Sequence, residues 1–472
     1  MVVHKSGAYM CVRYLLGVAA TVLLMAFAGP APALADTIEA ALVRAYQSNP
    51  QLNAQRAQLR SVDENVPQAL AGYRPQAALT GSLGYQYTDT YGLAVLAGGE
   101  LHGTNPPRSA GLTVTQTLYN GQQTSNKTRA AESRVSGARE ALRVLEQTVL
   151  LSAATIYMDY LRDAALVEVQ RSNTKVLEQQ VAQTSDRYHE GELTRTDVAQ
   201  AEASLAGARA TALTAQSTLQ ASMANYRKTV GEEPRSLAPV APIVKPIPKT
   251  LAEAVTISQV EHPAIVAMLH GVDAAALQIK IAEGALYPTV GLTGQLAQRY
   301  DLENFAHNSA IQGSVVGQIS IPIYDGGLSY ATTRQAKEQL GQQELQTDLQ
   351  RDNVRAVVVA AWGANQNSVG ILRAAQAQVE AAEVALAGVR EEAKVGQRTT
   401  LDVLNAQQTL LNARVQLVTA QHDEVVNSYN LLSAIGRLSI RTLGLAVAEY
   451  DPRVHFDQVK NKWIGLRTPD GK

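Results

Sequence analysis

The sequence contains two copies of one pattern, and this internal repeat limits the fold more than any other feature. The stretch KVGQRTTLDVLNAQQTL at residues 394–410 matches HEGELTRTDVAQAEASL at residues 189–205. Both carry a glycine, a threonine and an aspartate at the same spacing, and the two glycines lie 396 − 191 = 205 residues apart. A chain of 472 residues that repeats itself at nearly half its length is expected to fold as two similar units.

Matching segments extend through most of each copy. YRPQAALTGSL resembles LYPTVGLTGQL, and TQTLYNGQ resembles SIPIYDGG. The offset is 288 − 75 = 213 at the prolines and 324 − 119 = 205 at the tyrosines, so the first copy is 213 − 205 = 8 residues longer between them. Insertions collect in exposed loops. We therefore expect a β-hairpin with a variable tip over about residues 75–120 and again over about 288–325.

The first 35 residues have the pattern of a secretory signal peptide. Two basic residues precede an apolar run, and Ala33 and Ala35 supply the small side chains of a cleavage site. The only cysteine, Cys11, lies in this segment, and Asp36 stands where a lipid-anchored protein would carry its cysteine. We expect an exported chain without disulfides, cysteine metal sites or a lipid anchor.

Composition and motifs argue against several function classes. The formal net charge of −1 and the pI near 6.7 give no electrostatic reason to expect nucleic-acid binding. The sequence lacks metalloprotease, serine-hydrolase and phosphate-loop motifs, and its 8 histidines are scattered, so we expect these to be surface residues. We predict neither an enzyme nor a metal or cofactor site. After residue 35 no window has the roughly 18 apolar residues of a membrane helix, so any membrane insertion should use strands.

Four segments alternate apolar and polar side chains with a period of two. The intervening residues are mostly Thr, Ser and Gln, so each strand would have one apolar and one uncharged polar face. A soluble β-sandwich and a lipid-facing barrel with a polar lumen both fit this pattern. The apolar positions are Leu79, Leu83, Tyr85 and Tyr87; Leu112, Val114 and Leu118; Val290, Leu292 and Leu296; and Val315, Ile319, Ile321 and Ile323. Tyrosines near the strand ends favour the barrel, at Tyr73, Tyr91, Tyr119, Tyr287, Tyr300 and Tyr324.

Four strands are too few to close a membrane barrel. The smallest such barrels have about eight strands, and a free edge in hydrocarbon leaves unpaired amides that cost several kcal/mol each. A barrel would therefore need more than one chain. A dimer would supply 2 × 4 = 8 strands and a trimer 3 × 4 = 12, and the strand count alone leaves both open.

The rest of each copy has the composition of long helices. Residues 122–190 and 328–395 are rich in Ala, Gln and Glu and contain no proline. About 70 residues at a rise of 1.5 Å make a rod of roughly 105 Å. Apolar residues recur every seven positions from Val135 to Ile156, which is a coiled-coil spacing.

Two shorter helices are expected beside each long one. Return helices should cover about residues 192–231 and 397–436, and a helix of about 35 residues should precede each β-hairpin. Stacked end to end, the two shorter helices would pair along the whole long helix. The predicted domains are repeat 1 (36–245), which ends in a proline-rich connector forming an outer strap, repeat 2 (246–447) and a C-terminal tail (448–472).

Taken together, these features resemble the TolC-type outer-membrane channel family. The most specific stretches are SIPIYDGG and VGQRTTLDVLNAQ, and the likeness runs to the terminal YDPRVHFDQVKNKWIGL. The resemblance implies a mainly α fold with β, in which a long α-helical periplasmic barrel of coiled-coil-like hairpins joins a transmembrane β-barrel. Each chain would contribute four strands and two internal structural repeats to a homotrimer in outer-membrane lipid.

The resemblance also implies a transport function. The trimer would be an exit duct that works with a periplasmic adaptor and an inner-membrane ABC or RND-type pump in type I protein secretion, multidrug efflux or both. The missing lipid anchor and the terminal segment resemble the secretion-linked branch more than the lipoprotein efflux branch. A periplasmic coiled-coil scaffold without a pore is the alternative, but such a protein has no need of four strands with apolar faces.

Each copy of the opening motif is expected at the tip of a helical hairpin. Gly191 and Gly396 suit the left-handed conformation that ends a helix. A threonine three residues before Asp197, and another before Asp402, would form a capping box at the start of each return helix. By this interpretation the two aspartates only stabilise helix starts.

The resemblance assigns a second role to these tips, a closed periplasmic entrance. In the family an arginine two residues after the second glycine, and aspartates six and nine after it, line the entrance; Arg398 and Asp402 match, and Asn405 takes the last place. The arginine's family partners correspond to Thr196 and Asp197. We expect a constriction ring of three Asp402 side chains, with Asn405 beside it, and links from Arg398 that hold it shut.

Two departures from the family pattern weaken this predicted entrance. A family tyrosine corresponds to Ala393, so one closing link is missing. Because Asn405 replaces an aspartate, only one acidic ring remains. Its three carboxylates should raise one another's pKa and attract cations, but less selectively than two rings.

Overall fold

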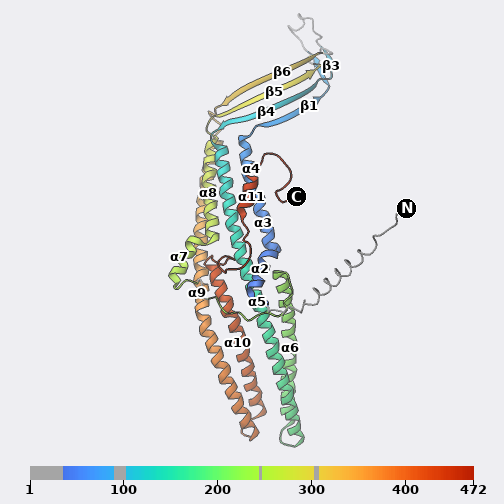
Figure 1. Cartoon of the computed structure of the whole chain (residues 1–472), viewed down its shortest axis with the longest axis vertical. Coiled ribbons are helices and arrows are strands. Elements are labelled where there is room, and N and C mark those ends of the chain that lie inside the picture. Colours follow the sequence, from blue (N-terminus) through green and yellow to red (C-terminus); the bar gives the residue numbers. More distant parts are fainter. Residues whose placement is uncertain (1–35, 90–101, 244–246, 302–307, 472) are drawn as a thin grey trace, which may run out of the picture.

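The computed structural model describes residues 36–89, 102–243, 247–301 and 308–471; the predicted signal peptide and Tyr91 lie outside these ranges. The chain is elongated, with a β-sheet at one end and the tips of two helical hairpins at the other (Figure 1). The elements are α2 (Ile38–Ser48), α3 (Pro50–Asp63), α4 (Asn65–Leu70), η1 (Ala71–Tyr73), β1 (Gln76–Leu83), β2 (Gln86–Asp89), β3 (His102–Asn105), β4 (Arg108–Asn120), α5 (Gln123–His189), α6 (Arg195–Val230), α7 (Leu251–Glu261), α8 (Pro263–Gly284), β5 (Thr289–Tyr300), β6 (Ser309–Ser320), α9 (Leu328–Lys394), α10 (Thr400–Ala434) and α11 (Pro452–Val459).

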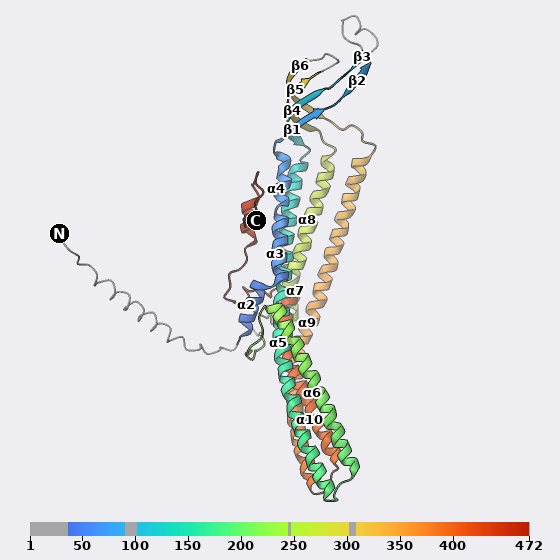
Figure 2. The same cartoon turned by 90° about the vertical axis from the view of Figure 1, so that its right-hand side faces the viewer.

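Each repeat contains one long helix and one return helix. The helices α5 and α9 have 67 residues each, which corresponds to a length of about 100 Å. The return helix α6 packs against α5 to form hairpin 1, and α10 packs against α9 to form hairpin 2. The two hairpins lie side by side (Figures 1 and 2). In α5 the seven-residue pattern marks the packed face, since Val135, Leu142 and Val149 are all buried.

The single helix of about 35 residues predicted before each β-hairpin is wrong. Repeat 1 has α2, α3 and α4 in this place, and repeat 2 has α7 and α8. The breaks fall at Asn49-Pro50 and Glu64 in repeat 1 and at His262-Pro263 in repeat 2, and Asn49 and His262 each end one helix and cap the next. A proline disfavours helical backbone in the residue before it but is well suited to the first turn of a new helix. Both prolines were visible in the sequence.

The shorter helices nevertheless stack along the long one. The half of α5 towards the tips contacts α6, whereas α3, α4 and α8 contact the half towards the sheet (Figure 2). The helix α8 also contacts α9, and therefore lies between the long helices of the two repeats. This arrangement agrees with the predicted end-to-end pairing.

The proline-rich connector ties the two repeats together. The hydroxyl of Tyr157 on α5 lies 2.7 Å from the carbonyl oxygen of Asp36 and 2.8 Å from that of Ala238 in the connector. Farther along, the backbone N–H of Ile243 donates to the hydroxyl of Ser428 on α10 at 3.1 Å. The connector thus holds α5 of repeat 1 and α10 of repeat 2 by backbone groups.

The largest apolar core lies at the waist of the molecule, where α2, α5, α6 and α10 meet. Its fully buried members include Tyr157, Tyr226, Leu150 and Leu432. Two of these, Tyr157 and Tyr226, form a tilted aromatic pair with centroids 6.4 Å apart. This core fixes the waist, from which the two hairpins extend.

The predicted strands form one antiparallel sheet in the order β1-β4-β5-β6. Its register places Leu112 between Leu79 and Leu296, and Thr113 between Ala78 and Gln295. One face is therefore mainly apolar and the other mainly polar, although the same register places Arg108, Gln116 and Gln298 on the apolar face, near its ends. The apolar face carries Leu79, Leu83, Leu112, Val114, Val290, Leu292, Leu296, Ile311, Val315 and Ile319. In the single chain this face is uncovered, and among the described strands β1 and β6 each pair on one side only.

Parts of the predicted strands lie outside this sheet. Tyr85 falls between β1 and β2, and Tyr87 belongs to β2, which pairs with β3 in a separate two-stranded sheet. At the break the N–H of Gly84 still donates to the carbonyl of Pro107 at 3.1 Å. Ile321 and Ile323 follow the end of β6. The tyrosines predicted at the membrane interface are exposed at Tyr73, Tyr119, Tyr287, Tyr300 and Tyr324.

One helical stretch is more apolar than the sequence analysis expected. Leu251–Gly284, which comprises α7 and α8, contains an 18-residue window with a mean hydropathy of 1.4, enough by length and composition to cross a membrane. It is interrupted at Pro263, and α8 contacts both α5 and α9. We interpret it as part of the packed helical wall.

Candidate functional site at the helical hairpin tips

Both helical hairpins turn through the same backbone geometry. Gly191 and Gly396 each have a φ of 80°, in the left-handed region. The next residue in each tip closes the helix end, because its N–H donates 2.9 Å to the carbonyl of Arg187 or of Glu392. A Cβ on either glycine would meet no atom within 4 Å. The glycines are therefore needed for their backbone conformation and not for lack of space.

Each return helix begins with a complete capping box. The N–H of Asp197 donates to the hydroxyl of Thr194 at 3.4 Å, and the Asp197 carboxylate accepts from the N–H of Thr194 at 3.0 Å. Asp402 and Thr399 repeat this arrangement at 3.2 and 3.0 Å. The two aspartates thus have the structural role expected for a helix start.

These caps also set the ionisation of the aspartates in a single chain. Hydrogen bonds from the side chain and backbone of Thr194 lower the pKa of Asp197. Those from the backbone and side chain of Thr399 lower the pKa of Asp402. The predicted rise of the Asp402 pKa concerns three clustered chains, where mutual repulsion would oppose this effect.

The two tips differ in which side of the glycine carries the basic residue of the ion pair and which side carries the acidic one. In hairpin 1, Arg187 at the end of the long helix pairs with Glu192 beyond the glycine at 2.8 Å. In hairpin 2 the charges are reversed, because Glu392 lies on the long helix and Arg398 beyond the glycine, at 2.7 Å. This hydrogen bond, followed by the charges of Glu392 and Asp402, raises the pKa of Arg398. Glu392 was not among the predicted site residues, although it lies only six residues before Arg398.

The single chain does not join Arg398 to its predicted partners. Among the described residues, the ion-pair partner of Arg398 is Glu392, and Thr196 and Asp197 are not within bonding distance of it. The bond to Glu392 uses Nε, so both Nη atoms can still donate to another carboxylate. Asn405 is exposed on α10, beyond Asp402. The closing links and the constriction ring therefore stay predictions about an assembly.

The two hairpins touch one another close to their tips. Leu404 of α10, two residues beyond Asp402, packs into a buried cluster with Leu177 of α5 and Leu205 of α6. A displacement of hairpin 2 away from hairpin 1 would expose this cluster. The tips are thus coupled by apolar contact within one chain.

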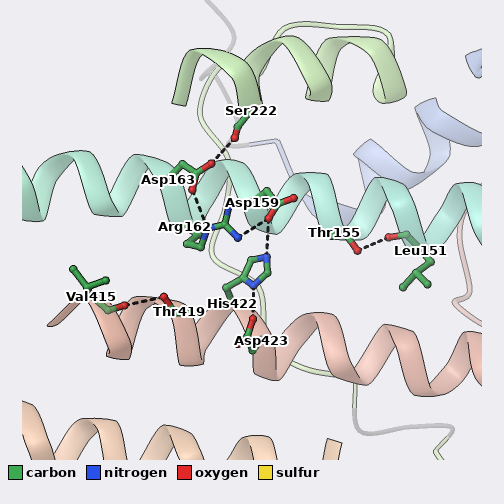
Figure 3. A network of polar contacts seen from close by, with 10 residues as sticks. All are labelled: Leu151, Thr155, Asp159, Arg162, Asp163, Ser222, Val415, Thr419, His422 and Asp423. Atoms are coloured by element: carbon green, nitrogen blue, oxygen red, sulfur yellow. Dashed lines mark hydrogen bonds and ion pairs between the residues drawn. The ribbon is translucent and has the colours of Figure 1, made fainter. Parts of the chain in front are cut away.

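A polar network joins the hairpins near the waist (Figure 3). The ring of His422 on α10 lies 3.0 Å from the carboxylate of Asp159 on α5 and 2.8 Å from that of Asp423. Arg162 contacts both Asp159 and Asp163 at 2.8 Å. Asp163 in turn accepts a hydrogen bond from Ser222 of α6. One network therefore connects α5, α6 and α10.

The expectation that all histidines are surface residues is wrong for His422 and His455, whose side chains are 9% and 11% exposed. His422 lies three residues before the buried Val425 on the packed face of α10. That spacing was the available signal, because residues three apart share a helix face.

We expect the His422 network to stabilise the protein most at mildly acidic pH. Burial lowers the pKa of His422, but hydrogen bonds to Asp159 and Asp423 outweigh it and raise the pKa above 6.5. Burial raises the pKa of Asp159, but His422 and Arg162 lower it below 3.8. The stabilisation from His422 is complete below the pKa of the histidine in the unfolded chain, and it is lost as the pH rises through the higher pKa of the folded state. The stabilisation from Asp159 is lost as the pH falls through the lowered pKa of its carboxylate.

The measurement is the thermal midpoint of His422→Gln against the parent protein across pH. The variant should lose about 2 kcal/mol per chain near pH 5–6 and less above about pH 7. His270→Gln removes a more exposed histidine, 3.7 Å from Asp273, and should have little effect. A His422→Gln deficit that is independent of pH would contradict the charged pairing.

In the part of the chain that the structure describes, no cluster of three or more His, Cys, Asp or Glu side chains has the arrangement of a metal site. At the tips the residues brought together cap helices, form ion pairs and pack against one another.

Comparison with known proteins agrees with the repeat and the fold. The family described as "Outer membrane efflux protein" matches residues 41–232 and again 256–437, once for each repeat. The efflux protein BepC of Brucella suis is 41% identical over 93% of this chain and 94% of its own length. TolC of Escherichia coli is 26% identical over 85% and 83%. The alkaline protease secretion protein AprF of Pseudomonas aeruginosa is 25% identical over 66% of each chain.

A solved structure has the same fold. The CmeC outer membrane channel of Campylobacter jejuni superposes with a TM-score of 0.76 at 15% identity, over 90% of this chain and 89% of that one.

Proposed function

This chain belongs to the outer membrane efflux protein family, and from that premise we propose that three copies form one exit duct through the outer membrane and across the periplasm. The observation that carries the proposal is the open sheet. Its apolar face is uncovered, and β1 and β6 have unpaired edges among the described strands. In hydrocarbon each unpaired amide would cost several kcal/mol, so the edges need partners. Pairing β6 of one chain with β1 of the next would close 3 × 4 = 12 strands around a polar lumen.

The helical part extends this lumen. Each chain supplies α5, α6, α9 and α10 at the tip end, so three chains would supply 3 × 4 = 12 helices. Long helices of about 100 Å are several times the thickness of a membrane, and are suited to cross the periplasm. The membrane-facing and periplasmic parts thus form one continuous passage.

The duct would be passive and would depend on partners for energy. We propose that it works with a periplasmic adaptor and an inner-membrane ABC or RND-type pump, in type I protein secretion, multidrug efflux or both. BepC is named as an efflux protein and AprF as a protease secretion protein, so one name supports efflux and the other supports protein secretion. A lumen lined by Thr, Ser and Gln suits many polar solutes.

The test combines fractionation, electrophoresis and single-channel recording. The protein should enter the detergent extract of outer membranes, migrate as a heat-modifiable trimer and conduct ions in planar bilayers. Cross-linking in cells should recover an adaptor and a pump. Recovery of a non-conducting protein in the soluble periplasmic fraction would instead favour the scaffold function.

We further propose that the tips form the periplasmic gate. Asp402 of three chains would surround the constriction, with Asn405 beside it, and Arg398 would bind Thr196 and Asp197 across a chain boundary. Support comes from the free Nη atoms of Arg398 and from the exposed positions of Arg398, Thr196 and Asn405 at the tips. The left-handed Gly191 and Gly396 set the tight turns that keep the entrance narrow.

Divalent cations should block this gate by binding the Asp402 ring. A divalent ion close to three carboxylates is attracted by all of them at once, and the attraction grows with the product of the charges. Asp402→Asn keeps an acceptor for the cap but removes the charge, and should weaken the block by at least roughly tenfold. Asn405→Asp should add a second ring and strengthen both block and cation selectivity. Single-channel recordings with and without divalent cations measure the block and the selectivity. If both variants are blocked as strongly as the parent channel, Asp402 does not line the constriction.

A further inference from the structure

The C-terminal tail presents an exposed apolar segment that the proposed channel does not use. Trp463, Ile464 and Leu466 are 66%, 89% and 103% exposed, respectively. Basic residues flank them, because Lys462 and Arg467 lie on either side, whereas Lys460 is paired with Asp457 at 2.7 Å. We call residues 460–467 the tail loop. Such a set of side chains on a soluble surface would leave apolar area in water without a compensating contact.

The tail loop is held at both ends. Before it, His455 of α11 hydrogen-bonds with the buried Asp63 of α3 at 2.8 Å. After it, Asp470 forms an ion pair with Arg60 of the same helix at 3.5 Å. The chain between these points therefore leaves the surface of α3 and returns to it. Figures 1 and 2 show this segment beside α4, below the sheet.

Arg74 fixes the loop at the base of the sheet. Its Nη1 donates to the carbonyl oxygen of Lys462 at 2.9 Å, and its guanidinium lies 4.7 Å from the ring centroid of Trp463. Arg74 stands two residues before the start of β1 and directly after Tyr73, which is 51% exposed. The loop thus lies level with a tyrosine at the end of the apolar face, where a membrane would begin.

We infer that the tail loop binds the periplasmic surface of the outer membrane, with its apolar side chains among the lipid headgroups and its cations on anionic phospholipid. This inference rests on the proposed membrane insertion of the sheet, and adds a second lipid contact outside the barrel. Tryptophan prefers the membrane interface, and lysine and arginine keep their charges at the phosphates while their stems lie along apolar surface. The contact with Arg74, two residues before β1, places the loop beside the proposed membrane-spanning sheet, and this favours lipid over a neighbouring chain as the occupant.

Tryptophan fluorescence can test the inference directly, because the chain has only two tryptophans. Trp362→Phe leaves Trp463 as the reporter. The variant is reconstituted into vesicles of phosphatidylethanolamine and phosphatidylglycerol with bromine at defined acyl-chain depths. Emission from Trp463 should shift to shorter wavelength and be quenched most by the shallowest bromines.

The matched control is Trp463→Phe, which leaves Trp362 on α9. That residue is 362 − 328 = 34 positions from the start of α9, or about 50 Å along the helix, and should not be quenched. A shifted but unquenched Trp463 would mean that a neighbouring chain covers it, and an unshifted one that it stays in water. Either result overturns the inference, provided that the same samples contain heat-modifiable, conducting trimers. Loss of trimer and conductance would instead count against the proposed function.

A second comparison tests whether the basic residues of the tail loop bind anionic phospholipid. Combining Lys462→Glu with Arg467→Glu should reduce the quenching of Trp463 in vesicles that contain phosphatidylglycerol, and much less in vesicles of phosphatidylcholine alone. Equal quenching of parent and variant in both lipids would refute the binding of anionic phospholipid.

Discussion

Val114→Arg should abolish assembly in the outer membrane, whereas Thr113→Arg, one residue away, should leave it intact. Val114 is the centre of β4 and lies on the apolar face, between Ala77 and Gly294. Thr113 lies on the polar face, between Ala78 and Gln295. An arginine on the lipid side of a barrel at the bilayer midplane costs about 2–4 kcal/mol. In a trimer the sum would be about 6–12 kcal/mol, which is comparable with the whole stability of a domain.

The two variants add the same side chain to the same central strand, so they differ only in the face that receives it. The measurement is the amount of heat-modifiable trimer in the outer-membrane fraction. Thr113→Arg should also alter conductance, because its charge would point into the lumen. Equal assembly of the two variants would show that this sheet does not face lipid, and would return the scaffold function to consideration.

Arg398→Ser should convert a mostly closed channel into a mostly open one. The proposed links of Arg398 to Thr196 and Asp197 are charge-assisted hydrogen bonds, which are stronger than neutral ones. Three symmetric copies of the link would be lost together, so their effects on the closed state add and shift the population towards the open state. The intrachain bond to Glu392 at 2.7 Å competes for the same guanidinium and therefore weakens each link.

The matched control is Arg187→Ser in the other tip. Arg187 forms the same kind of ion pair across a glycine, with Glu192 at 2.8 Å, but has no proposed partner in another chain. Single-channel conductance should rise severalfold for Arg398→Ser and remain unchanged for Arg187→Ser. An equal rise in both would mean that loosening either tip opens the entrance, and that Arg398 has no special link.

The residues of the proposed gate and the apolar face of the sheet differ in how directly the sequence predicts them. The alternation in the four strands follows from a period of two, and within the four-stranded sheet the register places most of the predicted apolar residues on one face as expected. The tip turns also follow from local rules, since Gly396 and the Thr399–Asp402 capping box lie within seven residues. The partner of Arg398 does not follow from such rules, because a long charged side chain can reach several neighbours.

Local patterns were misread where two signals competed. One continuous helix was predicted before each β-hairpin, but Pro50 and Pro263 each start a new one, with Asn49 and His262 as shared caps. In β1 the alternation continued through Tyr85, yet the ladder stops at Leu83. The period of the apolar residues shows which face of an element is apolar, but it does not show where the element ends.

The sequence by itself determined the doubled architecture, the two faces of the sheet and the caps at the tips, because each depends on residues a few positions apart. Only the tertiary structure decided which distant groups meet. His422 reaches Asp159 across 263 positions, and Arg74 reaches Lys462 across 388. Neither pair has a spacing that could be recognised, since contacts between helices and with the tail depend on how whole elements pack. That an open sheet has free edges was predicted from the strand count, but which of the described strands form them, β1 and β6, became evident only once the strand order was known.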